Sequence, residues 1–366
     1  MRIAFYAPLK SPDHPVPSGD RLMARLLVAA LRHAGHDVEI ASQLRSYAGS
    51  SADGAHDQAK SAADKEIARL SLEWSNGRAP DLWFCYHPYS KAPDLIGPAL
   101  SRQFGLAYVT AEASYSVRRN IGAWADSQVL VAEAVRQAAV NICLRQKDRA
   151  GLLTIAPAGR FEMLEPFIDA GAYSDTKPSL DSRRIVTVAM MRPGDKLESY
   201  RLLARSLEKI EHLKWTIAIA GDGPSRPEVM AQFARLAPAR LEWLGERQAA
   251  EMPSIYGSGA IYAWAGCGEA YGLAYLEAQA AGLPVVAQDI DGVPGVVRNG
   301  ETGILTQPGD TSAFADAIAT LLGDASLRRS MSQAARRFVF DERSFEVASA
   351  RLASILANIR AGRANG

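Results

Sequence analysis

Short apolar runs alternate along this chain with stretches whose apolar positions recur at helical spacing. Residues 2–7 form the first run, a proline-rich loop follows, and residues 21–34 have the pattern of an amphipathic helix that ends at Gly35. A second apolar run, residues 38–42, comes soon after. This order predicts a strand–helix–strand unit, and such alternation favours a parallel sheet covered by helices.

The same alternation continues to the end of the chain, with two polar interruptions. Residues 46–64, rich in Ser, Ala, Gly and Asp, predict a mobile loop leading into a helix, and the polar stretch 172–184 predicts a linker. Residues 345–360 predict a long closing helix. Further strands are predicted at 82–86, 107–110, 140–144, 185–190, 215–220, 241–244, 261–264, 285–287 and 303–305, and a helix at 128–139.

These elements predict an α/β protein of two domains, because a chain of 366 residues is long for one core. The first domain is expected over residues 1–180 and the second over 181–344, with a closing helix over 345–366. Both domains are predicted to be doubly wound parallel sheets. In such sheets ligands bind beyond the carboxyl ends of the strands, where the polar motifs described below are expected.

Composition narrows the classes of function. The net charge is +1, so no overall charge points to nucleic acid or acidic lipid. Hydrophobic residues make up 48% of the chain, which is ample for two cores. Cys85, Cys143 and Cys267 are odd in number and widely spaced, which predicts neither a disulfide framework nor a metal site. A cytoplasmic location is expected, with peripheral contact at the inner face of a membrane as the alternative. The basic segment 328–337 is expected to be a solvated helix face, with interfacial binding as its alternative.

Two carboxylates carry the first functional signal. Seven residues separate Glu269 from Glu277, and the pattern changes from a glycine-rich loop to a helix predicted over 273–281. Glu269 is therefore expected on a loop and Glu277 about one turn inside a helix. The helix start, at Gly272 and Leu273, offers unpaired N–H groups that can bind an anion. One acid before and one after such a helix start is typical of a site for a sugar nucleotide.

Around these acids the chain resembles the family 4 glycosyltransferases, which are retaining enzymes of the GT-B fold (glycosyl transferases group 1). The resemblance is strong over roughly residues 185–340. It is weak over 1–180, where only the first strand, its turn and the first helix match well. The motifs that carry it occur in the family's order and spacing, at 220–224, 243–245, 269–277, 278–286, 291–295, 299–303 and 307–310.

The resemblance implies two Rossmann-like domains facing a cleft, with the closing helix crossing back onto the first. It implies transfer of a sugar from a nucleoside-diphosphate sugar, of UDP or GDP type, to a saccharide, lipid or small-molecule acceptor. No catalytic metal and no other cofactor are implied. Asp289 and Asp291 have the spacing of a metal-binding Asp-x-Asp pair, but they lie in a segment where the family binds none.

Roles for individual residues follow from the same resemblance. Glu269 is expected to hold sugar hydroxyls and Glu277 the ribose diol. A second set is expected to contact the diphosphate or the nucleotide: Arg192 and Lys196 as cations, Gly272 and Leu273 through N–H groups, Gly19, Gly221 and Gly223 by close backbone approach, and Leu244 through its main chain at the base. The family's usual position for the Arg holds Met190 here, and a second glycine expected beside Gly19 is Asp20, a candidate N-cap.

Glu112 departs from the family, because many relatives carry a His in this segment near the reacting carbon. Its carboxylate is expected to accept the acceptor's proton, to bind a donor hydroxyl, or to be structural. His87 and His14 are further candidates. Two other functions stay open: a sugar-nucleotide epimerase or phosphorylase on the same fold, and a catalytically silent sugar-nucleotide-binding subunit. Release of free sugar or of epimerised donor separates the first from a transferase, and donor hydrolysis excludes the second.

Overall fold

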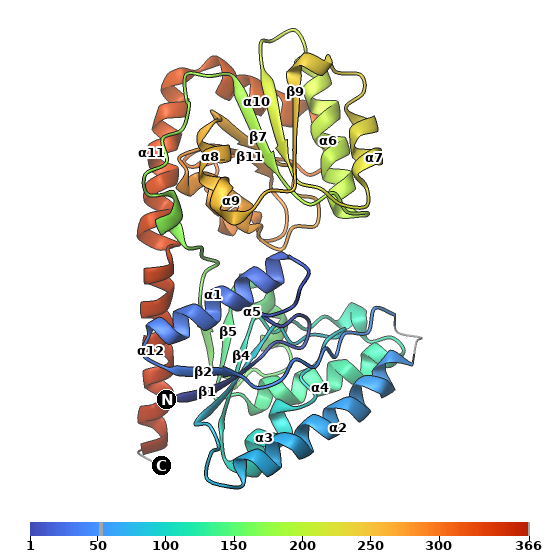
Figure 1. Cartoon of the computed structure of the whole chain (residues 1–366), viewed down its shortest axis with the longest axis vertical. Helices are drawn as coiled ribbons and strands as arrows, with labels where there is room; N and C mark the ends of the chain where they lie inside the picture. The colour runs from blue at the N-terminus through green and yellow to red at the C-terminus, as the bar shows by residue number, and fades with distance from the viewer. Residues whose placement is uncertain (51–53, 365–366) are drawn as a thin grey trace. The chain divides into compact units, whose positions relative to one another are not determined.

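The computed structural model describes residues 1–50 and 54–364 of the chain (Figure 1). Contacts between residues divide it into two compact units. Unit 1 comprises Met1–Glu165 and Glu346–Gly366, and unit 2 comprises Pro166–Phe345. The polar stretch 172–184 lies in unit 2. No helix of the described residues is long and apolar enough to cross a membrane.

Unit 1 is built on a six-stranded sheet in the order β2-β1-β3-β4-β5-β6, with every neighbouring pair parallel. The strands are short and mostly buried on both faces, as in other parallel sheets. They are β1 (Arg2–Tyr6), β2 (Asp37–Ile40), β3 (Leu82–Tyr86), β4 (Ala107–Ala111), β5 (Val140–Cys143) and β6 (Phe161–Met163).

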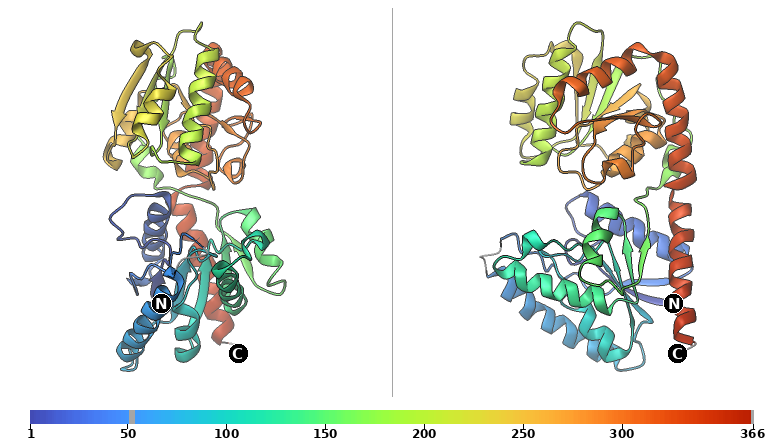
Figure 2. Two further views of the ribbon diagram at one scale, coloured as in Figure 1. Left: turned by 90° about the vertical axis from the view of Figure 1, so that its right-hand side faces the viewer. Right: turned by 180° about the vertical axis from the view of Figure 1, so that it is seen from behind.

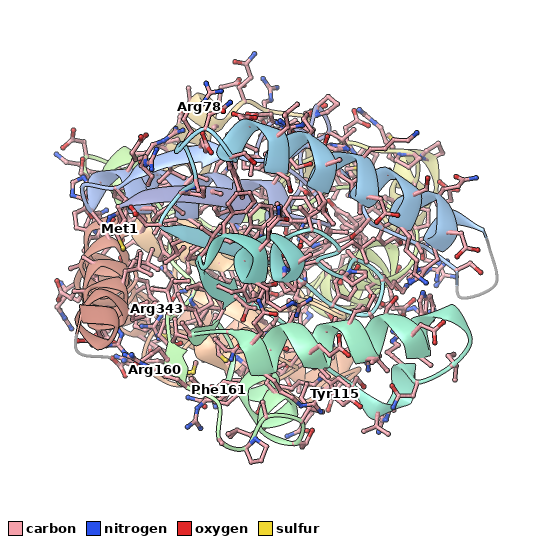
Figure 3. The ribbon with its side chains drawn as sticks, turned by 90° about the horizontal axis from the view of Figure 1, so that it is seen from below. Met1, Arg78, Tyr115, Arg160, Phe161 and Arg343 are labelled. Atoms are coloured by element: carbon pink, nitrogen blue, oxygen red, sulfur yellow. The ribbon has the colours of Figure 1, made fainter. Side chains whose placement is uncertain are left out.

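Helices connect these strands and cover the sheet (Figures 1 and 2). Large aromatic side chains of alternate strand residues, including Tyr6, Trp83 and Tyr108, form a buried core with residues of α2, α3 and α4. Figure 3 views this layer of helices from below. On the sheet's other side Phe5 stacks on Phe84, with ring centroids 5.6 Å apart. The helices are α1 (Gly19–His33), α2 (Ala55–Trp74), α3 (Gly97–Phe104), η1 (Val117–Arg119), α4 (Ala123–Gln137) and α5 (Gln146–Leu153).

The last helix, α12 (Phe345–Ala364), completes unit 1 although it comes at the end of the chain. Leu352, Ile355 and Leu356 on it are buried. Its Arg351 donates to Glu162 at 2.8 Å and to the carbonyl of Met163 at 3.2 Å, both in β6. These bonds hold the helix against the edge strand of the sheet.

Unit 2 repeats the architecture with a six-stranded parallel sheet in the order β12-β11-β10-β7-β8-β9. Its strands are β7 (Arg184–Val188), β8 (Thr216–Ala220), β9 (Leu241–Gly245), β10 (Ile261–Ala263), β11 (Val285–Gln288) and β12 (Gly303–Thr306). Its helices are η2 (Ala170–Tyr173), α6 (Asp195–Lys209), α7 (Arg226–Gln232), η3 (Pro238–Arg240), η4 (Ala249–Glu251), α8 (Met252–Gly257), α9 (Leu273–Ala280), η5 (Val293–Gly295), α10 (Thr311–Gly323) and α11 (Ala325–Glu342).

The basic segment of α11 differs from the expected solvated face. Arg328 is only 5% exposed and donates to the carbonyls of Leu322 at 2.9 Å and Leu180 at 3.0 Å. Arg336 donates to Ala280, the last residue of α9, at 2.9 Å. These guanidinium groups satisfy buried or helix-terminal carbonyls that would otherwise lack donors. The prediction was wrong for these two arginines, whereas Arg329 and Arg337 are exposed as expected. A charge pattern does not show which cations have interior partners.

Strand order marks one position in each sheet where the direction of winding reverses. In unit 1 the chain passes from β1 to β2 on one side and later adds β3 on the other. In unit 2 it passes from β7 through β8 to β9 and then adds β10 on the other side of β7. At such a switch point the loops after the two neighbouring strands diverge and leave room for a ligand beyond their carboxyl ends.

The predicted strands all occur, with ends shifted by at most two residues. The predicted mobile loop over 46–64 is wrong in its later part, because α2 already begins at Ala55. Residues 51–53 of that loop lie outside the described residues. The short strand β6 was not predicted, since three residues give little periodicity.

Candidate active site

An ion pair lies at the switch point of unit 2. Lys196, the second residue of α6, follows β7, and Glu269 lies in the loop after β10. The Lys196 ammonium contacts Glu269 Oε1. The Trp264 indole donates to the same oxygen at 3.3 Å, and the ammonium lies 5.5 Å from the centre of the Trp264 ring. The fold thus joins two predicted site residues that are 73 positions apart.

Two glycines fix the loop that carries Glu269. Gly268 and Gly272 have φ values of +65° and +75°, which glycine adopts without steric cost. A Cβ on Gly268 would lie 2.3 Å from a carboxylate oxygen of Asp195, in the first turn of α6. A Cβ on Gly272 would lie 2.7 Å from the ring of Tyr275 in α9 and 3.8 Å from the Glu269 carboxyl carbon. The loop therefore holds Glu269 beside the starts of both helices.

The helix starts give this region a positive potential in addition to Lys196. α9 begins at Leu273 with Gly272 as its N-cap residue, as predicted, and α6 begins after Gly194. Neither cap residue offers a side-chain acceptor to the first N–H groups. Those N–H groups and the helix dipoles favour an anion. Arg192, half-buried, lies in the loop between β7 and α6 and completes the predicted cationic set.

Glu277 occupies the expected place inside α9, and its Oε2 accepts a hydrogen bond from the Tyr256 hydroxyl at 3.0 Å. Burial raises the pKa of the Glu277 carboxyl, and the Tyr256 bond opposes that change. The rings of Tyr256, Tyr262 and Tyr275 follow one another at centroid distances of 5.8 Å. Burial, and then the charges of Glu269 and Glu277, raise the pKa of Tyr262, so this buried ring lies near both acids.

The structure shows why residues 221 and 223 are glycines, which the sequence alone did not show. A Cβ on Gly221 would lie 1.9 Å from the carbonyl oxygen of Ala189, and one on Gly223 would lie 2.3 Å from that of Met191. The close approach that both glycines permit here is to the chain segment after β7. Leu244 lies in β9, and its carbonyl accepts a bond from the Arg247 guanidinium at 2.8 Å.

Unit 1 has its own charged cluster at its switch point. His87 follows β3, Glu112 follows β4, and Asp20 is the second residue of α1, after β1. The His87 Nδ1 lies 3.2 Å from Asp20 Oδ1. Glu112, 2% exposed, accepts a bond from the Tyr86 hydroxyl at 2.9 Å. Sequence reasoning treated Asp20 as a candidate N-cap, but Ser18 is the cap, since its side chain accepts from Arg21 N at 3.2 Å.

Both His87 and Glu112 have left-handed backbone, with φ values of +61° and +55°. Non-glycine residues rarely adopt this conformation, and where the surrounding structure enforces it the strain is often found at functional sites. Main-chain bonds enforce it here: His87 N donates to Ala111 O at 2.8 Å and Glu112 N donates to Ile142 O at 2.8 Å. The two side chains are thereby turned onto the carboxyl edge of the sheet.

The electrostatics of this cluster are coupled. Burial alone would lower the pKa of the His87 imidazole, but the charges of Glu112 and Asp20 outweigh burial and raise it. Burial raises the pKa of Glu112, against the opposing charges of His87 and Arg145. Burial would also raise the pKa of Asp20, but its bond to His87 lowers it. The charges of Glu112 and Asp20 therefore favour the protonated form of His87.

The predicted site residues thus divide between the two units, with Gly221 and Gly223 just after β8 and Leu244 in β9 of unit 2. Arg192, Lys196, Glu269, Gly272, Leu273 and Glu277 lie around the starts of α6 and α9 in unit 2, and Gly19 and Glu112 lie at the switch point of unit 1. His14 is separate in role, because its imidazole accepts a bond from Val16 N at 3.1 Å and shapes its own loop. Three polar partners were missed: Trp264, Tyr256 and the pairing of Asp20 with His87. Only proximity in the fold reveals them.

Comparison with known proteins supports this picture for unit 2 in particular. The family model described as glycosyl transferases group 1 matches residues 182–324, which contain every predicted site residue of unit 2. A D-inositol 3-phosphate glycosyltransferase of Corynebacterium efficiens is 36% identical over 137 residues, 36% of this chain and 32% of that protein. The chain thus matches about a third of that relative's length.

Longer matches exist at lower identity. An alpha-D-kanosaminyltransferase of Streptomyces kanamyceticus is 29% identical over 290 residues, covering 75% of this chain and 74% of that protein. Sucrose-phosphate synthase of Thermosynechococcus elongatus superposes with a TM-score of 0.77 over 99% of both chains, at 18% identity. HepE of Anabaena, solved in complex with UDP, gives a TM-score of 0.73 at 16% identity over 98% of this chain and 100% of that chain. The chain therefore has the GT-B fold, and its residues 182–324 are similar to the glycosyl transferases group 1.

Proposed function

We propose that this protein is a retaining glycosyltransferase that moves a sugar from a UDP- or GDP-type nucleotide sugar to a saccharide, lipid or small-molecule acceptor, without a metal ion. The observation that supports it most is the meeting of Lys196 and Glu269 beside the starts of α6 and α9. A cation and two helix N-termini suit a diphosphate, and the adjacent carboxylate suits sugar hydroxyls.

In this proposal unit 2 binds the donor. Glu269 accepts hydrogen bonds from hydroxyls of the transferred sugar, and Glu277 accepts them from the ribose diol while Tyr256 orients its carboxylate. Arg192, Lys196 and the N–H groups of Gly272 and Leu273 bind the diphosphate. Leu244 is proposed to contact the base through its main chain, and Gly221 and Gly223 shape the neighbouring loop.

Charge development explains why these groups would accelerate transfer. The bond from the anomeric carbon to the diphosphate oxygen breaks as the acceptor attacks, and negative charge grows on the departing phosphate. Fixed cations and helix N–H groups stabilise that charge without reorganising, which is the largest catalytic contribution in many enzymes. They take the place that a metal ion has in other transferases. For retention, we propose attack from the face of the leaving phosphate, which itself accepts the acceptor's proton.

Unit 1 is proposed to act on the acceptor side. Gly19 is the first residue of α1, and a Cβ there would have no described heavy atom within 4 Å, so its own fold does not require glycine. That supports contact with the donor phosphates. Glu112, whose charge raises the pKa of His87, is proposed to orient the acceptor hydroxyl. The relatives are named for different substrates, among them inositol 3-phosphate and kanosamine, which leaves the acceptor of this chain to experiment.

The proposal is tested by following donor and product together. The protein is incubated with UDP- and GDP-sugars and candidate acceptors, with and without excess chelator, and the anomeric configuration of the product is read by NMR. We expect transfer with retention at an unchanged rate under chelation. Inverted product contradicts retention. Loss of activity restored by Mn²⁺ or Mg²⁺ contradicts metal independence and returns attention to Asp289 and Asp291. Epimerised donor, or sugar 1-phosphate formed from phosphate, contradicts the transferase itself.

A further inference from the structure

A cavity within unit 1 has no role in the function proposed so far. Its volume is about 250 Å³, room for roughly eight water molecules, which is the scale of one monosaccharide. Its walls come from the turn after β3 and the segment after β4, together with Gln128 of α4. The turn is fixed, because Tyr89 and Ala92 exchange main-chain hydrogen bonds of 3.2 and 2.9 Å around Ser90 and Lys91.

Two cations line this cavity and none of its lining residues is acidic. Lys91 and Arg119 approach the same indole, that of Trp124, at 4.9 and 5.4 Å from the ring centre. Within residues 1–50 and 54–364 neither cation pairs with a carboxylate. Their charges are therefore available to an anion, and the contact with Trp124 restricts where the two side chains lie.

A buried acceptor complements the cations. Gln128 is 2% exposed and lines the cavity, and its amide nitrogen donates to the carbonyl of Ser116 at 2.5 Å. That contact fixes which way the amide points, because a carbonyl can only accept. The other atom, Oε1, is buried and has no hydrogen-bond partner among the described residues. An unpaired buried oxygen is costly, and a ligand hydroxyl would satisfy it.

The cavity adjoins the His87–Glu112 cluster. Tyr89, on its wall, stacks on the His87 ring with centroids 5.0 Å apart and planes inclined by 25°. Ser114, also on the wall, follows Glu112 by two residues, and its N–H donates to Pro88 O at 3.1 Å. A molecule in the cavity would lie next to the residues assigned to the acceptor side.

We propose that this cavity is an acceptor subsite for an anionic polyol, a hydroxylated molecule of about monosaccharide size that carries a phosphate or carboxylate group. Lys91 and Arg119 bind the anionic group, Gln128 Oε1 accepts from a hydroxyl, and the serines Ser90 and Ser114 supply further polar contacts. The assignment of this molecule as acceptor rests on the proposed function, whereas its binding does not. A phosphorylated polyol exists both free and as a lipid headgroup, so the test separates these sources.

The test measures binding by calorimetry with glucose 6-phosphate, glycerol 3-phosphate and glucuronate, and with glucose and inorganic phosphate for comparison. Vesicles of phosphatidylcholine with and without phosphatidylinositol form the lipid arm. We expect at least one anionic polyol to bind about tenfold more tightly than glucose or inorganic phosphate. Binding to the phosphatidylinositol vesicles alone assigns the headgroup as the source. Failure of every anionic polyol and of both vesicles overturns the proposal.

Variants locate the binding. Lys91→Ala and Arg119→Ala should each weaken binding of the anionic polyol about tenfold. The control is Arg78→Ala, which should leave binding unchanged, because Arg78 is exposed and lies far from Tyr115 in Figure 3. Gln128→Leu should weaken the binding of the polyol but not the binding of inorganic phosphate. Unchanged affinity in both cation variants overturns the proposal, as does loss of nucleotide affinity in Arg119→Ala, which would make the cavity part of the donor site. Polyol binding without any nucleotide binding would reject the proposed function and leave the subsite standing.

Discussion

The two units carry charged clusters at equivalent places, the switch points of their sheets, but the clusters differ in kind. In unit 2 the Lys196–Glu269 pair is partly exposed, with 26% and 17% of the side chains accessible, and stands beside two helix starts. In unit 1 the Glu112 carboxylate is 2% exposed and His87 and Glu112 have left-handed backbone. The first arrangement suits binding and release of a charged leaving group. In the second, the charges of Glu112 and Asp20 favour the protonated form of a buried histidine.

The difference explains which half of the site a sequence reveals. Around Glu269 the spacing of glycines and the helix start at Leu273 are local signals. The loop, the helix and the position of Glu277 about one turn inside that helix were therefore predicted correctly. The unit 1 cluster joins residues after three separate strands, and no spacing connects Asp20, His87 and Glu112. The parallel sheet brings them together, and tertiary hydrogen bonds impose their unusual φ values.

The largest expected effect is in unit 2. Glu269→Gln should lower the rate of sugar transfer by about a thousandfold, because the amide keeps the shape but loses the charge that binds sugar hydroxyls and Lys196. The melting temperature should stay within a degree or two, since a surface-reaching loop carboxylate contributes little to the core. Glu228→Gln, an exposed acid of α7, is the matched control. Activity equal to the control would reject the role of Glu269.

The second-largest effect is expected for Lys196→Ala. This variant should lose about 3 kcal/mol of transition-state stabilisation, which lowers kcat roughly a hundredfold. The rate should fall more than the donor KM rises, because the ammonium matters most when charge grows on the leaving diphosphate. Steady-state kinetics with Lys214→Ala, an exposed lysine of the same unit, as control provide the check. A rise in KM at unchanged kcat would show that Lys196 only binds.

Glu112→Gln should have a smaller effect, about tenfold to a hundredfold on transfer, with donor affinity unchanged. Because the Glu112 charge raises the pKa of His87, removing it should lower that pKa, which NMR titration of the imidazole measures directly. Glu133→Gln, exposed on α4, is the control. An unshifted His87 titration would contradict the coupling, and wild-type transfer at every pH would make Glu112 structural.

The smallest effect is on stability. The folded-state pKa of His87 is raised, so its protonation stabilises the fold fully below about pH 6.5 and the contribution is lost as the pH rises through the folded value. The advantage of the wild type over His87→Gln in free energy of unfolding should therefore shrink as the pH rises from about 6.5 through the folded-state pKa of His87. Urea unfolding across this range measures it. A constant difference would mean that His87 stays neutral.

The most direct test of the account is a calorimetric titration of UDP and of GDP into the wild type and into Glu277→Gln, in which Tyr256 keeps a hydrogen-bond acceptor. We predict that the wild type binds one nucleotide clearly more tightly than the other, and that Glu277→Gln weakens this binding about tenfold, as for one lost charge-assisted contact to the ribose. Wild-type protein that binds neither nucleotide, or a variant that binds the preferred one equally well, would contradict the donor site assigned to unit 2.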